Sequence, residues 1–208
     1  MNSKMLMSDE EFLEGRRRSL RESIEYFSAK NKPERERWVC LEFLRNLGVG
    51  YDETEIVSAD DDPPDVIFRD ACFEIKEILD VDRLRHAEYK ASLEKALATT
   101  DPQDLLHQYT PKDITPSEIG NQIQLKLNEL NTHYPLSVRE ITDLLFYVNL
   151  QEHHLKIGPI PAAADFASFN WRSVAALFGW GALVFCTAPS APAFLRAKAE
   201  TLTLRRIV

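Results

Sequence analysis

The chain has 208 residues, of which 44% are hydrophobic and 28% charged, so it is not a wholly disordered protein. Its 25 basic and 33 acidic side chains give a formal net charge of −8, which argues against a protein that coats nucleic acid by overall charge. No apolar run reaches the roughly 18 residues of a membrane span. Three cysteines without disulfide-like or zinc-like spacing indicate reduced core thiols in a cytoplasmic protein.

The first part of the chain is predicted to be helical. Ser8, followed by three acidic residues, predicts the start of a helix that runs to about residue 29. Pro33 opens a second helix, which Gly48 ends. The pattern then changes, and strands are predicted over 51–58, 65–68 and 73–79. The short polar link between the last two predicts an antiparallel hairpin.

Helical periodicity returns over 81–98 and 116–130, and the apolar run 143–150 predicts a central strand. After a Pro/Ala-rich linker at 158–164, the pattern predicts a helix over 169–178, a strand over 182–187 and a helix over 191–198. We interpret residues 1–208 as one α/β domain with a mixed sheet flanked by helices. Its core spans about 33–150, and residues from about 159 to 208 form an α-β-α extension.

The predicted hairpin carries the residues with the clearest chemical meaning. If its turn pairs Phe68 with Phe73, Asp65 lies opposite Lys76. Directly opposite residues share a face and side chains alternate, so Asp65, Glu74 and Lys76 project from one face of the hairpin. Carboxylate oxygens suit Mg²⁺ or Mn²⁺, which lowers the pKa of a bound water and screens phosphate charge. Lys76 would orient or deprotonate that water, or neutralise charge in the transition state.

Pro64-Asp65 followed by Glu74-Ile75-Lys76 resembles the PD-(D/E)xK nuclease motif, which many restriction enzymes, Holliday-junction resolvases and repair nucleases share. The order of predicted elements over about 34–150 is similar to that fold. The resemblance implies a restriction-endonuclease-like α-β-β-β-α-β core, to which this chain adds an N-terminal helix and an inserted helix at 81–98. It implies that Asp65, Glu74 and the main-chain carbonyl of Ile75 bind the divalent cation. The whole chain also resembles a small bacterial family of uncharacterised proteins described as "putative endonucleases".

Members of the nuclease family often carry an acid on the first core helix and a polar residue on the helix after the lysine strand. The resemblance assigns Glu36 to the first position, with an ordinary Glu–Arg helix pair as the alternative. Gln122 and Lys126 are four residues apart, so they share one helix face. Together with Arg35 and Arg37, they are the predicted contacts to nucleic acid.

The sequence therefore predicts an endonuclease or phosphodiesterase that uses Mg²⁺ or Mn²⁺ and acts on nucleic acid, DNA in preference to RNA. Two alternatives stay open. One is an inactive nuclease-fold module that binds a partner protein or acts as a regulatory subunit, and the other is a metal-dependent hydrolase of a small phosphate substrate. A homodimer stays open as well. Residues 58–80 hold eight acids and two bases, a balance of −6, so acidity gathers around the predicted metal site and nucleic-acid binding should depend on the metal.

Overall fold

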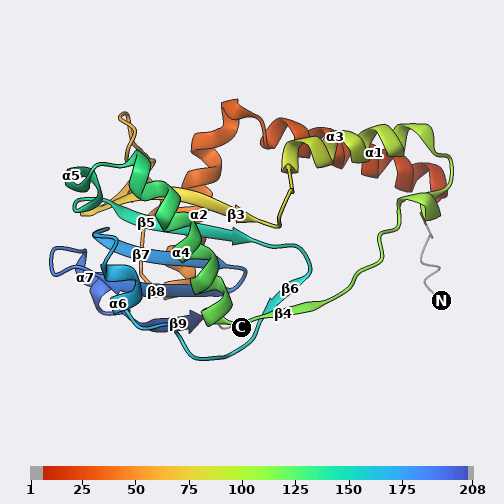
Figure 1. The fold of residues 1–208 in the computed structure, drawn as a ribbon. Helices are drawn as coiled ribbons and strands as arrows, with labels where there is room; N and C mark the ends of the chain where they lie inside the picture. Colours follow the sequence, from red (N-terminus) through yellow and green to blue (C-terminus); the bar gives the residue numbers. More distant parts are fainter. Residues whose placement is uncertain (1–6, 206–208) are drawn as a thin grey trace, which may run out of the picture. The chain divides into compact units, whose positions relative to one another are not determined.

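A computed structural model describes residues 7–205, and the chain divides into two compact units that we describe separately (Figure 1). The first unit contains the segments up to residue 32 and from 81 to 110, and the second contains 33–80 and the segment from 111 onward. Within residues 7–205, no helix has both the length and the apolar character that crossing a bilayer requires.

The first unit is a pair of helices that pack against one another. Its elements are α1 (Asp9–Tyr26), η1 (Ala29–Asn31), α3 (Arg85–Ala98) and η3 (Pro102–Leu105). A capping box starts α1, because Glu11 N donates to Ser8 Oγ at 3.2 Å and Ser8 N donates to the Glu11 carboxylate at 2.8 Å. The rings of Phe27 and Tyr89 stack at 5.2 Å, and Arg17 Nε donates to Ala96 O at 2.9 Å. Both predicted helices are confirmed, with shorter bounds.

The second unit is built on a seven-stranded mixed sheet. Its strands, in spatial order, are β1 (Ile56–Ser58), β2 (Val66–Phe68), β3 (Ala71–Leu79), β5 (Asp143–Asn149), β7 (Ser173–Phe178), β8 (Gly181–Thr187) and β9 (Thr201–Leu204). The strands β3, β5 and β7 run parallel, and the other neighbours are antiparallel. A second, two-stranded sheet pairs β4 (Lys112–Ile114) with β6 (His153–Leu155). The predicted mixed α/β class is confirmed.

Helices cover both faces of the large sheet (Figure 1). On one face lies α2 (Lys32–Leu47), whose apolar residues pack with Phe73, Leu145 and Leu177. On the other face lies α4 (Pro116–His133), which packs with Leu144 and Phe146. The remaining elements of this unit are η2 (Glu53–Glu55), α5 (Leu136–Arg139), α6 (Ala164–Ala167) and α7 (Ala193–Arg196). The buried apolar residues of β3 and β5 therefore alternate between the face that α2 covers and the face that α4 covers.

The C-terminal part of the chain differs from its prediction. Residues 173–178 form the buried strand β7, where a helix was predicted, and β9 was not predicted at all. The α-β-α extension is therefore wrong, since this part adds three strands to the same sheet. All six residues of β7 are buried because both its faces are covered. Such a short apolar run has no period that would distinguish a strand from a buried helix.

The hairpin of β2 and β3 has a different register from the one predicted. Val66 pairs with Phe73 and Phe68 with Ala71, so the pairing of Phe68 with Phe73 is wrong by two residues. The turn is shorter than expected, and Arg69 adopts a positive φ of 54° within it. Because side chains alternate with a period of two, a two-residue shift keeps each side chain on its predicted face. Asp65 now lies beside Glu74 rather than beside Lys76.

Candidate metal centre

The start of β2 and the middle of β3 bring three carboxylates together. Asp62, Asp65 and Glu74 each offer one oxygen, and these oxygens lie within 4.8 Å of one another. Asp65 and Glu74 are buried, whereas Asp62 is exposed. Asp65 immediately precedes β2, and its N–H donates to Phe73 O at 2.9 Å, which fixes it next to β3. We call these three residues the carboxylate cluster.

Asp65 also completes the hydrogen bonding of β3. Its Oδ2 accepts from Ile75 N at 2.8 Å, at a level where the paired residues of β2 have already ended. A strand residue directs its N–H and its C=O toward the same neighbour. The carbonyl of Ile75 is therefore directed toward the side of the strand where Asp65 lies.

Glu74 is fully buried and its two oxygens differ sharply. Oε1 accepts from Tyr134 Oη at 2.5 Å and from Lys76 Nζ. Oε2 is buried and has no hydrogen-bond partner within the part of the chain that the structure describes. Buried polar atoms are nearly always paired, and an unpaired carboxylate oxygen is costly. Glu74 Oε2 thus has the properties of a ligand atom, held in place by the two donors on Oε1.

Lys76 and Tyr134 both act as donors at this site. Burial disfavours the ammonium of Lys76, but its hydrogen bonds with Glu74 and Tyr134 raise its pKa above the usual value. Burial and the hydrogen bond to Glu74 raise the pKa of Tyr134. The ammonium lies 5.5 Å from the centre of the Tyr134 ring, whose other neighbour is Trp171, with ring centres 5.2 Å apart. Lys76 is therefore a fixed positive charge beside the carboxylate cluster.

Glu36 and the cluster lie on different sides of the sheet. Glu74 pairs with Leu144, which packs on the α4 face, whereas Glu36 belongs to α2 on the opposite face. Glu36 is buried, but its carboxylate is not among the three that converge. Its metal-binding role therefore stays a prediction.

The four predicted nucleic-acid contacts lie on two helices. On α4, Gln122 and Lys126 are half-buried, and Lys126 Nζ pairs with Glu129 Oε2 at 2.5 Å. On α2, Arg35 is half-buried and Arg37 is exposed, with Arg37 Nε donating to Ile56 O at 2.9 Å. Arg37 thus helps to hold β1 against α2.

Sequence reasoning missed two residues of the site, Asp62 and Tyr134. Asp62 ends a run of three aspartates, and nothing in the sequence distinguishes it from its neighbours. Tyr134 is the C-cap of α4, sixty positions from Glu74, and only the pairing of β3 with β5 brings the two together. The available signal was weak: a polar aromatic residue at the end of the helix that precedes the central strand.

A second buried acid, Asp143, provides a comparison, because both of its carboxylate oxygens have hydrogen-bond partners. Asp143 is fully buried at the start of β5, and Arg172 pairs with it through Nε at 3.1 Å and through a second guanidinium nitrogen. Ser173 Oγ and Cys72 N donate to it as well, at 2.8 Å and 3.1 Å. Both oxygens of Asp143 are occupied, so this group is a structural ion pair, in contrast to Glu74.

The fold and site define a mixed α/β protein with a carboxylate cluster at its large sheet, in which two of the three acids are buried. A family model described as "Putative endonuclease, protein of unknown function (DUF1780)" matches residues 8–207, and the chain belongs to this family. The chain is also similar to a solved structure of a protein of unknown function from Pseudomonas aeruginosa strain PAO1, described as "Monooxygenase Superfamily". The two chains are 25% identical over 96% of each, with a TM-score of 0.65. The comparison with curated proteins gives no match.

Proposed function

We propose that this protein is a metal-dependent endonuclease that hydrolyses phosphodiester bonds in nucleic acid, DNA in preference to RNA. The observation that carries the proposal is the buried, unpartnered Oε2 of Glu74 within a cluster of three carboxylates beside Lys76. The description of the family supports an activity of this kind. The element order α2-β1-β2-β3-α4-β5, with β3 between an antiparallel and a parallel neighbour, supports a restriction-endonuclease-like core.

The donor set fits Mg²⁺ or Mn²⁺. Asp62, Asp65 and Glu74 supply hard oxygen ligands, and the carbonyl of Ile75 is directed toward Asp65. Such a cation, when bound, lowers the pKa of a water ligand and offsets phosphate charge. Tyr134 and Lys76 orient Glu74 by donating to its Oε1. Lys76 also places a positive charge where a phosphate would approach.

The description of the similar structure names a different chemistry, so the ligand types at the cluster are informative. Non-haem iron oxygenases bind their metal with two histidines and one carboxylate. The group that converges in the described part of this chain consists of carboxylates alone. A ligand set made only of oxygens favours Mg²⁺ or Mn²⁺ and therefore phosphoryl chemistry.

The test is a cleavage assay with the purified full-length protein. Supercoiled plasmid, single-stranded DNA and RNA are incubated with Mg²⁺ or Mn²⁺, and the wild type should cleave at least one of them. Asp65→Asn and Lys76→Met should lose this activity. The first removes a charged metal ligand while keeping an oxygen acceptor for Ile75 N, and the second removes the positive charge beside the carboxylate cluster. Asp70→Asn, at an exposed acid in the turn of the same hairpin, is the matched control and should cleave normally. Equal cleavage by all variants would indicate a contaminant, and the absence of metal-dependent cleavage would favour the non-catalytic module.

A further inference from the structure

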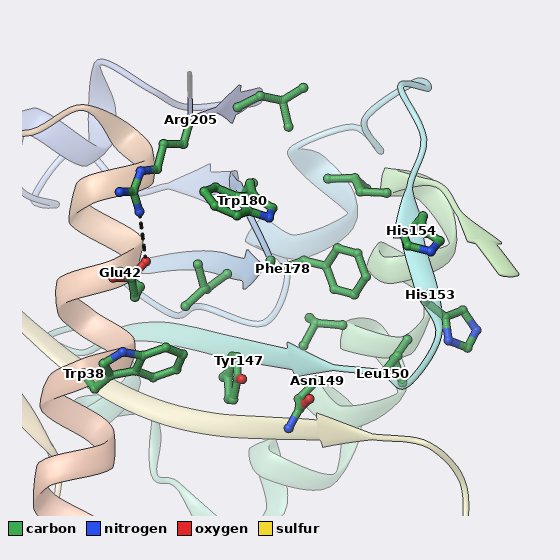
Figure 2. A pocket seen from close by; sticks show the side chains of 16 residues that line it. Trp38, Glu42, Tyr147, Asn149, Leu150, His153, His154, Phe178, Trp180 and Arg205 are labelled. Carbon is green, nitrogen blue, oxygen red and sulfur yellow. Dashed lines mark hydrogen bonds and ion pairs between the residues drawn. The ribbon is translucent and has the colours of Figure 1, made fainter. Parts of the chain in front are cut away.

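A pocket of about 600 Å³ lies at the carboxyl ends of β5 and β7 (Figure 2). It is lined by residues of α2, of these two strands, of β6 and of the turn between β7 and β8. Ligands of α/β proteins commonly bind outside the carboxyl ends of parallel strands, and this volume is typical of ligand pockets. The pocket shares no residue with the carboxylate cluster, so it is a separate site.

Aromatic side chains form opposite walls of the pocket. Trp38 and Tyr147 meet edge to face with ring centres 5.6 Å apart on one side, Trp180 lies on the other side, and Phe178 lies toward His154 (Figure 2). Trp180 is 56% exposed and Trp38 is 43% exposed. Exposed tryptophans on two sides of one hollow offer stacking surfaces to a planar ring.

Polar groups complete the lining and restrict what the ring can be. The guanidinium of Arg205 lies 5.5 Å from the ring centre of Trp180 and pairs with Glu42 at 3.4 Å. Arg45 pairs with the same carboxylate at 2.5 Å, so the two arginines and Glu42 together carry a net positive charge at the rim, which would attract an anionic group. Asn149, His153 and His154 add polar side chains to the lining, where Asn149 Nδ2 donates to Glu77 Oε1 at 3.1 Å and His153 Nδ1 lies 2.6 Å from Gln151 O. Such a lining suits a ring with polar edges that shares or exchanges these contacts. A planar ring with polar edges and an attached anion is the chemistry of a nucleotide.

We propose that this pocket binds one unpaired nucleotide, with its base between Trp38 and Trp180 and its phosphate near Arg205. The identity of the ligand rests on the proposed nuclease function. In a duplex the faces of each base are covered by its neighbours, so only an unstacked base can enter such a pocket. The preferred substrate is therefore a nucleic acid with a single-stranded region, and a free mononucleotide is the other source of the same chemistry.

Binding is measured on the full-length protein by fluorescence anisotropy of a labelled oligothymidylate. A chelator is present, so the metal-dependent binding expected at the carboxylate cluster does not contribute and only the pocket is tested. The competitors are unlabelled oligothymidylate, AMP, ribose 5-phosphate, a blunt-ended hairpin duplex and riboflavin. Single-stranded DNA should bind, AMP should displace it, and ribose 5-phosphate and the duplex should displace it much less well. Trp180→Leu should weaken binding about tenfold or more, whereas Trp180→Phe should retain most of the affinity. Tyr109→Leu, at an equally exposed aromatic residue outside the pocket, is the matched control and should bind normally.

Four results would overturn the inference. The first is unchanged affinity in both Trp180→Leu and Trp38→Leu. The second and third are displacement by ribose 5-phosphate equal to that by AMP, and displacement by the duplex equal to that by the single strand. The fourth is displacement by riboflavin but not by AMP. Because the assay contains no metal, it is independent of the cleavage test. Tryptophan-dependent AMP binding without any metal-dependent cleavage would overturn the proposed nuclease alone. Cleavage without base-dependent binding would overturn the role of the pocket alone.

Discussion

Replacing Glu74 by glutamine separates a metal ligand from an ordinary buried ion pair. In Glu74→Gln the amide oxygen still accepts from Tyr134 and Lys76, as Oε1 does in the wild type. The amide nitrogen replaces Oε2, which has no partner within residues 7–205, and adds a donor beside the other two carboxylates of the cluster. Neutralising Glu74 weakens its pair with Lys76, but it also removes the unpartnered charged Oε2 and the repulsion among the three carboxylates. Because these effects oppose one another, the metal-free variant should be about as stable as the wild type, but unable to bind the cation.

The expected rise in Tm follows from the concentration of the cation relative to its Kd and from the length of the chain. A cation present at 100 times its Kd stabilises the folded state by about 2.7 kcal/mol. For a chain of this length each kcal/mol shifts Tm by about 2–4 °C, so Mn²⁺ should raise the Tm of the wild type by about 5–11 °C. If Glu74 were only the partner of Lys76, its neutralisation would instead break a buried pair and cost about 3–5 kcal/mol.

The assay is thermal unfolding with and without Mn²⁺. The wild type and Asp70→Asn should show the full metal-dependent rise, whereas Glu74→Gln should show none and should keep a metal-free Tm close to that of the wild type. A metal-free Tm of Glu74→Gln more than about 6 °C below the wild type would refute the reasoning, since it would correspond to about 3 kcal/mol at the lower slope. A full Mn²⁺ response in this variant would refute it as well.

Three further predictions concern the fold. Gly120→Ala should lower the free energy of unfolding by about 1–3 kcal/mol in a urea titration, because the added Cβ would lie 2.7 Å from Pro161 Cγ. Gly15→Ala, where the added Cβ meets open space within a helix, should raise the free energy of unfolding by about 0.5–1 kcal/mol. Arg172→Leu should cost about 3–5 kcal/mol in the same titration, because it leaves Asp143 buried and charged without its cation; a loss below about 1 kcal/mol would contradict this. At about pH 8, a thiol reagent should react with at most one cysteine of three before urea is added, because burial raises two of the thiol pKa values to about 12. Those two thiols belong to Cys40 and Cys186.

Local signals in the sequence predicted much of the fold. The cap at Ser8, the terminating Gly48 and the apolar run of β5 each act over a few residues, and the elements they predict are present. The strand β7 was predicted as a helix because its burial on both faces depends on the helices and on β5 and β8 around it, which no local pattern encodes.

The candidate site, too, was predicted where the signal is local and missed where it depends on tertiary contacts. Asp65, Glu74 and Lys76 could be placed on one face because they lie on one hairpin, and their face depends only on the period of the strand. The exact register of the hairpin could not be predicted, because it depends on whether the turn contains two residues or four. Tyr134 could not be found either, because its contact with Glu74 exists only once β5 has paired with β3.

The hydrogen bond from Ile75 N to Asp65 Oδ2 makes one side chain serve both the backbone and the proposed chemistry. At Asp65, therefore, the amount of folded protein and the activity should fall together in most substitutions, and only asparagine should separate them. Asp62 is exposed, so its substitutions should spare folding and change activity alone. In homologues that no longer need the reaction, Asp62 would be substituted first, and Asp65 would be retained because folding requires its hydrogen bond to Ile75 N.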